Sequence, residues 1–176
     1  VFRCKLKPGE LLPDTSLEVI LTDDFINDPH GFSHTAKPIA FDDKGNLYVP
    51  FGSPSDACQQ MDRIPESPGQ DPCPQLAEHA GIWKFDPNKK NQTIRDGQRF
   101  ATGIRSAVAI TWNPADKNLY VVQHGRDDLH RTWPGLYNKW QSAILPSEEF
   151  LRVKEGTDAG WPYYYYDQVQ EKKLLN

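Results

Sequence analysis

The sequence predicts an all-β protein, a β-propeller, on three observations. Short apolar runs alternate with turn-forming residues. Fifteen prolines and twelve glycines interrupt the 176 residues too often for long helices. One strand–turn–strand unit occurs twice. The strands we expect cover residues 17–21, 38–41, 46–51, 81–85, 107–112, 118–123 and 150–153.

The repeated unit consists of an apolar strand, a polar turn rich in Asp or Asn, and the tetrapeptide Asn-Leu-Tyr-Val, which begins at Asn46 and again at Asn118. Repeated hairpins are typical of blades arranged around an axis. A β-sandwich with two similar hairpins is the alternative. Because a blade takes about 40–50 residues, we expect residues 1–176 to form one partial propeller domain, roughly three blades or half of a whole propeller.

Composition and charge exclude several classes of protein. The apolar fraction is 38% and the charged fraction 25%, which is typical of a folded globular chain. No window has the run of about 18 apolar residues that a membrane span needs. The net charge is −4, and the basic residues are scattered among acidic ones, so nucleic acid is not an expected partner.

Cys58 and Cys73 bracket a polar loop rich in Pro and Gly, which cannot be held together by burial alone. A disulfide would stabilise such a loop by roughly 3 kcal/mol and would indicate an oxidising compartment, periplasmic or extracellular. Two reduced thiols or a pair of metal ligands are the alternatives, and Cys4 is left over.

Loops at the ends of the expected strands carry the candidate functional residues. His34 precedes the 38–41 strand in a Gly-interrupted segment and could act as a general base, or be a capping or surface histidine. Its spacing from His30 resembles a zinc pair, but Pro29 and Gly31 oppose the helix that such a pair requires. Arg105 precedes the 107–112 strand and could grip an anionic ligand or form a structural ion pair.

The 118–123 strand ends in the sequence His-Gly-Arg-Asp-Asp. Main-chain oxygens around Gly125 and the neighbouring carboxylates would suit calcium. His124, Asp127 and His130 would suit zinc in a metal-dependent hydrolase, and a solvated turn is the third alternative. Further along the chain, other carboxylates flank a run of four tyrosines and could bind a second calcium or form a charged strand edge: Glu148, Glu149 and Asp167.

Taken in order, these motifs resemble a known family. A histidine precedes "PIAFDDKGNLYV", "GIR" precedes "AVAITWNPADKNLYVVQHG", and "EEFLRVKEGTDAGWP" follows. From about residue 16 onward the chain resembles the soluble quinoprotein glucose/sorbosone dehydrogenases. The insert between the cysteines and "GWPYYYYD" are most similar to the sorbosone dehydrogenase-like branch.

The resemblance implies a six-bladed β-propeller that binds pyrroloquinoline quinone (PQQ) and Ca²⁺ and oxidises a sugar or a sugar-derived alcohol or aldehyde. It implies an electron acceptor such as a c-type cytochrome. His34 would be the general base, and Arg105 would contact PQQ. Ser106 stands where the family commonly has Asn, which removes an amide contact to the cofactor.

For the metal, the resemblance implies calcium ligation by the carbonyls of Gly125 and Arg126. Glu148 and Glu149 match positions near the family's structural calcium sites, and Ala159 replaces an aromatic residue found there in many members. A propeller that binds a ligand without catalysis, and the hydrolase described above, are the competing hypotheses.

Overall fold

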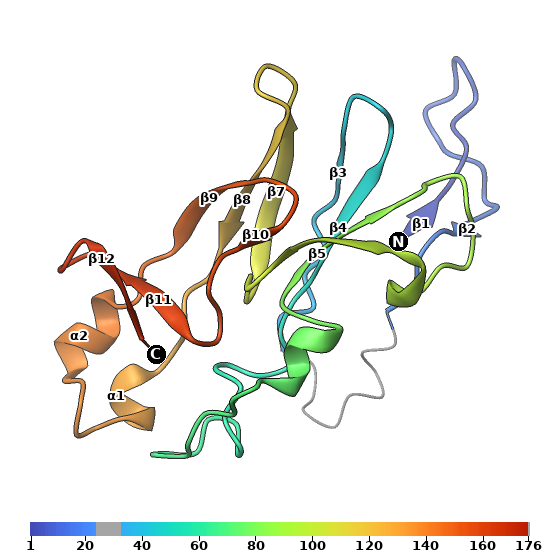
Figure 1. Cartoon of the computed structure of the whole chain (residues 1–176). Helices are drawn as coiled ribbons and strands as arrows, with labels where there is room; N and C mark the ends of the chain where they lie inside the picture. Colours follow the sequence, from blue (N-terminus) through green and yellow to red (C-terminus); the bar gives the residue numbers. More distant parts are fainter. Residues whose placement is uncertain (24–32, 176) are drawn as a thin grey trace.

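The computed structural model describes residues 1–23 and 33–175. Two antiparallel meanders dominate it (Figure 1). The first contains β3 (Ala40–Phe41), β4 (Leu47–Phe51), β5 (Gly81–Phe85) and β6 (Gln98–Thr102). The second contains β7 (Ala107–Asn113), β8 (Asn118–Gln123) and β9 (Glu149–Val153).

Shorter elements surround these sheets. β1 (Phe2–Arg3) pairs with β2 (Glu18–Val19), and β11 (Tyr164–Asp167) pairs with β12 (Lys172–Leu175). β10 (Thr157–Asp158) leaves the second meander and pairs in parallel with β6. The helices are short: α1 (Leu129–Thr132), α2 (Lys139–Ile144) and two 3₁₀ turns at Pro74–Ala77 and Ile94–Asp96.

Alternation along the strands explains how the sheets pack. In β4 and β5 the cross-strand pairs Leu47–Phe85 and Val49–Trp83 point to one face, and Tyr48–Lys84 points to the other. The first face packs on Ile20 and Leu21 of the N-terminal segment. The second packs against the other meander and forms a core of residues from both sheets: Ala40, Tyr48, Ile82, Phe100, Ala101, Ile104, Ala107, Leu119, Val121, Val153 and Ala159.

The predicted all-β class is confirmed, since the sheets dominate and both helices are short. β3 and β7, the first strands of the two meanders, lie against each other. Neighbouring blades that share an axis are arranged in this way. The described residues form no closed propeller, and an open pair of blades is consistent with part of one.

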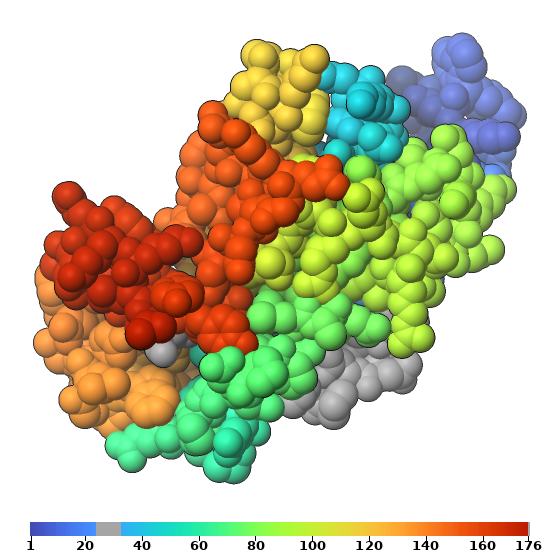
Figure 2. Space-filling view, in the orientation of Figure 1, coloured from blue at the N-terminus to red at the C-terminus, as the bar shows by residue number. Residues whose placement is uncertain are grey.

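Residues 129–148 and 164–175, which carry α1, α2, β11 and β12, form a lobe next to the insert bracketed by the cysteines (Figure 2). The Tyr137 and Tyr165 hydroxyls, 3.2 Å apart, join its helical part to β11. In the described part of the chain, no helix has the length and apolar character needed to cross a bilayer.

Candidate functional site

Three distant segments meet where β4 and β8 end. Ser53, just after β4, donates its main-chain N–H to the carbonyl oxygen of Arg105 at 2.8 Å. The guanidinium of Arg105 in turn donates through Nη1 to the carbonyl oxygen of Gly125 at 2.5 Å. The strand ends therefore bring together loops that lie between 20 and 72 residues apart in the sequence, as expected for neighbouring blades.

Arg105 forms a buried ion pair with Asp56. Its side chain is 3% exposed and that of Asp56 is 0% exposed. Nη2 donates to Asp56 Oδ1 at 2.5 Å, and Nε donates to the Asp56 carbonyl oxygen at 3.1 Å. Since a buried arginine requires a compensating charge, this pair accounts for the position of Arg105 before a buried strand.

Asp127 lies on the outer side of this ion pair. Arg105 Nη2 and Arg63 Nη2 donate to its Oδ2 at 3.0 and 3.1 Å, and its side chain is 57% exposed. Partial burial alone would raise the pKa of Asp127, but the charges and hydrogen bonds of the two arginines outweigh it and lower this pKa. Two guanidinium groups thus hold one carboxylate at the surface.

His34 joins the same cluster through Ser53. Its Nδ1 lies 2.7 Å from the Ser53 carbonyl oxygen and 3.0 Å from Ser53 Oγ. Burial and the nearby charge of Arg105 lower the pKa of His34 below its ordinary value. The imidazole is therefore neutral at pH 7, and the carbonyl requires the proton to be on Nδ1. Nε2 then carries the free lone pair, and no residue of the described part donates to it.

Glycine is required at two positions of this site. A Cβ at Gly52 would overlap the His34 carbonyl oxygen and lie 2.6 Å from its Cβ. A Cβ at Gly125 would lie 2.6 Å from the carbonyl oxygen of Pro146. Both contacts are closer than real Cβ atoms tolerate, so close approach of backbone explains each glycine. His30 lies outside the described residues.

The residues predicted to bind calcium have other partners. The Gly125 carbonyl faces the Arg105 guanidinium, and Glu148 Oε2 lies 2.7 Å from His124 Nδ1. Glu149 accepts a hydrogen bond from Gln123. Asp167 is buried, and Oδ1 accepts from the main-chain N–H groups of residues 169 and 170 at 2.8 and 2.9 Å.

The hydrolase hypothesis needs His124, Asp127 and His130 around one metal. His124 pairs with Glu148, Asp127 with two arginines, and His130 Nδ1 lies 2.8 Å from the Tyr137 carbonyl oxygen. Over residues 1–23 and 33–175, no group of three or more His, Cys, Asp or Glu side chains is placed to hold a metal ion. This geometry gives the hydrolase no support.

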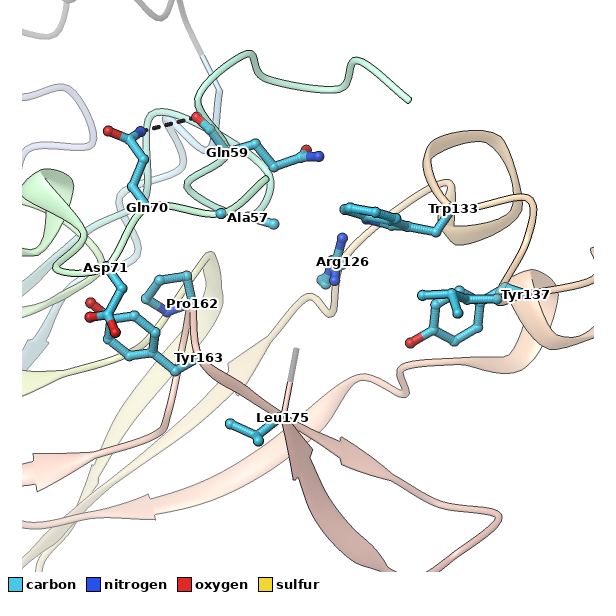
Figure 3. Close-up of a pocket in the computed structure, with 12 residues that line it drawn as sticks. Ala57, Gln59, Gln70, Asp71, Arg126, Trp133, Tyr137, Pro162, Tyr163 and Leu175 are labelled. Atoms are coloured by element: carbon cyan, nitrogen blue, oxygen red, sulfur yellow. Dashed lines mark hydrogen bonds between the residues drawn. The ribbon is translucent and has the colours of Figure 1, made fainter. Parts of the chain in front are cut away.

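A pocket of about 330 Å³ lies beside the cluster, between the insert and the lobe (Figure 3). Arg126 projects into it between the loop of Ala57 and Gln59 and the rings of Trp133 and Tyr137. The Arg126 side chain is 6% exposed, and burial lowers its pKa. The pocket therefore combines largely apolar walls with one buried cation, which lies 3.9 Å from Asp56, and one carboxylate, Asp71.

The space directly beside Arg105 is much smaller. A cavity of about 30 Å³ is lined by Arg105, Gly125, Arg126 and Glu149, together with Trp161 and Tyr164–Tyr166. It has room for roughly one water molecule. Ser106 is buried and does not line the larger pocket, and its carbonyl oxygen accepts the N–H of His124 at 3.0 Å.

The predicted disulfide between Cys58 and Cys73 is confirmed. Both half-cystines are buried and pack with Ala80 and Trp161. Trp161 Nε1 donates to the carbonyl oxygen of Asp56 at 2.8 Å. The disulfide and the Gly-Trp-Pro turn thus fix the segment that carries the partner of Arg105, while Cys4 is exposed and free.

Sequence reasoning missed Asp56 and Arg63, both close to or inside the insert. The available signal was their position: Asp56 follows the end of β4 as Asp127 follows the end of β8. A buried arginine also calls for an acidic partner on a neighbouring strand end. The predicted catalytic, cofactor and metal roles of the other residues stay predictions.

The chain shares its fold with known structures. No family model matches the chain, and no curated protein matches it. Among solved structures, it is similar to the iodide structure of the Trichoderma reesei carbohydrate-active enzyme of family AA12, with a TM-score of 0.70 and 16% identity over 96% of this chain. The calcium structure of that protein gives a TM-score of 0.67 at 15% identity, again over 96% of this chain.

The holo form of the PQQ domain of pyranose dehydrogenase from Coprinopsis cinerea gives a TM-score of 0.59 and 14% identity over 94% of this chain. The chain spans 40%, 40% and 39% of these three structures. The similarity establishes the fold: this chain folds like part of a PQQ domain. It does not support the sorbosone branch, which stays a prediction.

Proposed function

We propose that this chain is part of a PQQ-dependent oxidoreductase that oxidises a sugar or a sugar-derived alcohol or aldehyde. Its fold is that of part of a protein described as a PQQ domain. The observation that carries the proposal is the convergence of His34 and Arg105 on Ser53 at the end of two neighbouring sheets. Bound PQQ would supply the redox chemistry by accepting a hydride equivalent.

In this proposal His34 is the general base. The Ser53 carbonyl fixes the tautomer, and burial with the Arg105 charge keeps the ring neutral. Nε2 can then accept the proton of a substrate hydroxyl. A positioned base of this kind typically contributes about 10²–10⁴-fold to the rate.

An anionic cofactor fits the charge of the site. Arg63 and Arg105 together hold the half-exposed carboxylate of Asp127, which is the donor arrangement that a carboxylate of PQQ would need. Arg105 and Arg63 would therefore hold PQQ after Asp127 yields its place, and Arg126 would add a third cation from the neighbouring pocket. Ser106 contributes its backbone to the turn beside Arg105.

Calcium does not fit the arrangement of its predicted ligands. The Gly125 carbonyl is directed at a guanidinium, and a cation at that oxygen would be repelled by Arg105. Glu148, Glu149 and Asp167 are engaged by separate partners, as described above. We derive no catalytic step through calcium.

The test uses protein that carries these 176 residues. PQQ binding is measured by calorimetry, and oxidation of glucose and sorbosone is followed with a redox dye. His34→Ala should bind PQQ normally and lower turnover at least about 10²-fold. His124→Ala is the matched control, because His124 is half-exposed and pairs with Glu148 outside the cluster. Turnover that is unchanged in His34→Ala would remove His34 from the mechanism.

A non-catalytic ligand-binding module is the second candidate. One observation favours it: Asp56, Gly125 and Asp127 already accept hydrogen bonds from Arg105. The same calorimetry decides, since this candidate predicts no PQQ binding. A c-type cytochrome as electron acceptor, and a periplasmic or secreted location, complete the proposal; the disulfide supports an oxidising compartment.

A further inference from the structure

A second pocket, of about 380 Å³, lies at the opposite end of the two sheets. β4 and β8 run from their hairpin turns toward the candidate site, so the turns that line this pocket are at the far end of the strands (Figure 1). Its walls come from both meanders and include the stacked rings of Tyr48 and Trp112, whose centroids are 6.1 Å apart.

Four lysines from four separate segments line this pocket. Lys44 is in the β3–β4 turn, Lys84 on β5, Lys117 in the β7–β8 turn, and Lys154 just after β9. Within the described residues, none of them forms a salt bridge with a carboxylate. Lys84 is half-buried because it pairs with Tyr48 across the strands, on the face that packs against the other sheet.

Three carboxylates line the same pocket, so the four lysines exceed them by one charge. Asp42 accepts hydrogen bonds from Asn46 Nδ2 at 2.7 Å and from the Tyr48 hydroxyl at 3.0 Å. Glu155 accepts one from Gln98 Nε2 at 2.8 Å. Asp43 is exposed. An unpaired lysine on a face between two sheets is unfavourable unless an anion balances its charge.

Trp112, which lines the pocket, has a hydrogen-bond donor without an acceptor among the described residues. The indole N–H of Trp112 is buried and has no partner in the described part of the chain. Buried donors in folded proteins are nearly always satisfied. A ligand oxygen in the pocket would satisfy this one, and the aromatic faces beside it suit the apolar face of a sugar ring.

From these observations we propose that the pocket binds a sugar that carries a negatively charged group, either a carboxylate or a phosphate. The lysines would hold the anionic group, and Trp112 would contact the ring. This inference is independent of the proposed oxidoreductase activity, because the pocket shares no residue with the candidate site.

The experiment is calorimetry at low ionic strength on the 176-residue chain without PQQ, with four probes: glucuronate, glucose 6-phosphate, glucose and inorganic phosphate. We expect glucuronate or glucose 6-phosphate to bind, and the one that binds more tightly identifies the anionic group. Glucose that binds as tightly as both would overturn the role of the charge. Inorganic phosphate that binds as tightly would overturn the role of the sugar.

Variants locate the site. Lys84→Gln and Lys117→Ala should each weaken binding at least about tenfold, since a hydrogen bond to a charged group is lost. Trp112→Phe should weaken it as well, by removing the indole N–H. The control is Lys139→Ala, which removes an exposed lysine on α2. The proposal would be contradicted if Lys139→Ala weakened binding equally, or if neither anionic sugar bound.

Discussion

The imidazole Nδ1 of His34 lies 2.7 Å from the carbonyl oxygen of Ser53. This contact joins the segment before β3 to the segment after β4 and sets the tautomer of the ring. It also places the histidine near Arg105, whose charge contributes to the lowered pKa of His34. The proposed base therefore depends on backbone geometry rather than on an acidic partner.

The lowered pKa of His34 makes stability depend on pH. The unfolded chain binds a proton on this ring near its ordinary value of about 6.5, whereas the folded chain binds it only at lower pH. Stability is therefore unaffected above about pH 6.5 and falls as the pH decreases from there toward the folded pKa. Chemical denaturation between pH 7.5 and 5 should show this loss, and His34→Gln should reduce it.

The close approach at Gly52 predicts a strong effect of a single methyl group. Gly52→Ala should displace His34 and destabilise the fold by about 1–3 kcal/mol, since the overlap involves backbone that cannot rotate away. The His34 ring signals in NMR spectra should shift. Gly69→Ala is the control, because an added Cβ there meets no atom within 4 Å. Similar stability in both variants would contradict this packing.

Removing the charge of Asp56 should destabilise the fold much more than removing the charge of Asp127. Asp56→Asn leaves Arg105 buried without its full partner and should cost about 3–5 kcal/mol in the free energy of unfolding. Asp127→Asn alters a half-exposed carboxylate and should cost at most about 1 kcal/mol. Urea denaturation measures the free energy of unfolding of both variants. A larger decrease in Asp127→Asn than in Asp56→Asn would contradict the prediction.

The disulfide should contribute measurably to stability. It closes a loop with a sequence separation of 15, for which removal should cost about 3 kcal/mol. The double variant Cys58→Ser/Cys73→Ser should melt at a lower temperature than the native chain. Cys4→Ser should melt like the native chain, because Cys4 is exposed and free. Equal melting temperatures for all three would show that burial alone holds the insert.

Much of the central fold could be predicted from local sequence. β4, β5, β7 and β8 match the expected ranges within about one residue, because β-branched and aromatic residues fill them and turn residues bound them. β6 was not predicted, since "QRFAT" has a single large apolar residue and becomes a strand only by pairing with β5. Tertiary contacts decide such weak segments.

The other features that the sequence did not predict were missed for similar reasons. The four tyrosines before Asp167 give no alternation, so β11 was not expected, and α1 and α2 are too short for a helical period to be visible. At the site, the repeat placed the loops after the second hairpin strands on one face, and the family resemblance joined His34 and Arg105 to Gly125 in one site. The pairing of Arg105 with Asp56 was not predicted, because a buried ion pair between residues 49 apart leaves no local pattern.

The two residues of β10 couple the unfolding of the two sheets. This segment belongs by sequence to the second meander, yet it lies along β6 of the first, where Thr157 is opposite Ala101. The Ala159 N–H then donates to the Thr102 carbonyl oxygen at 3.0 Å. Separating the sheets requires these contacts to break, so they couple the unfolding of one sheet to that of the other.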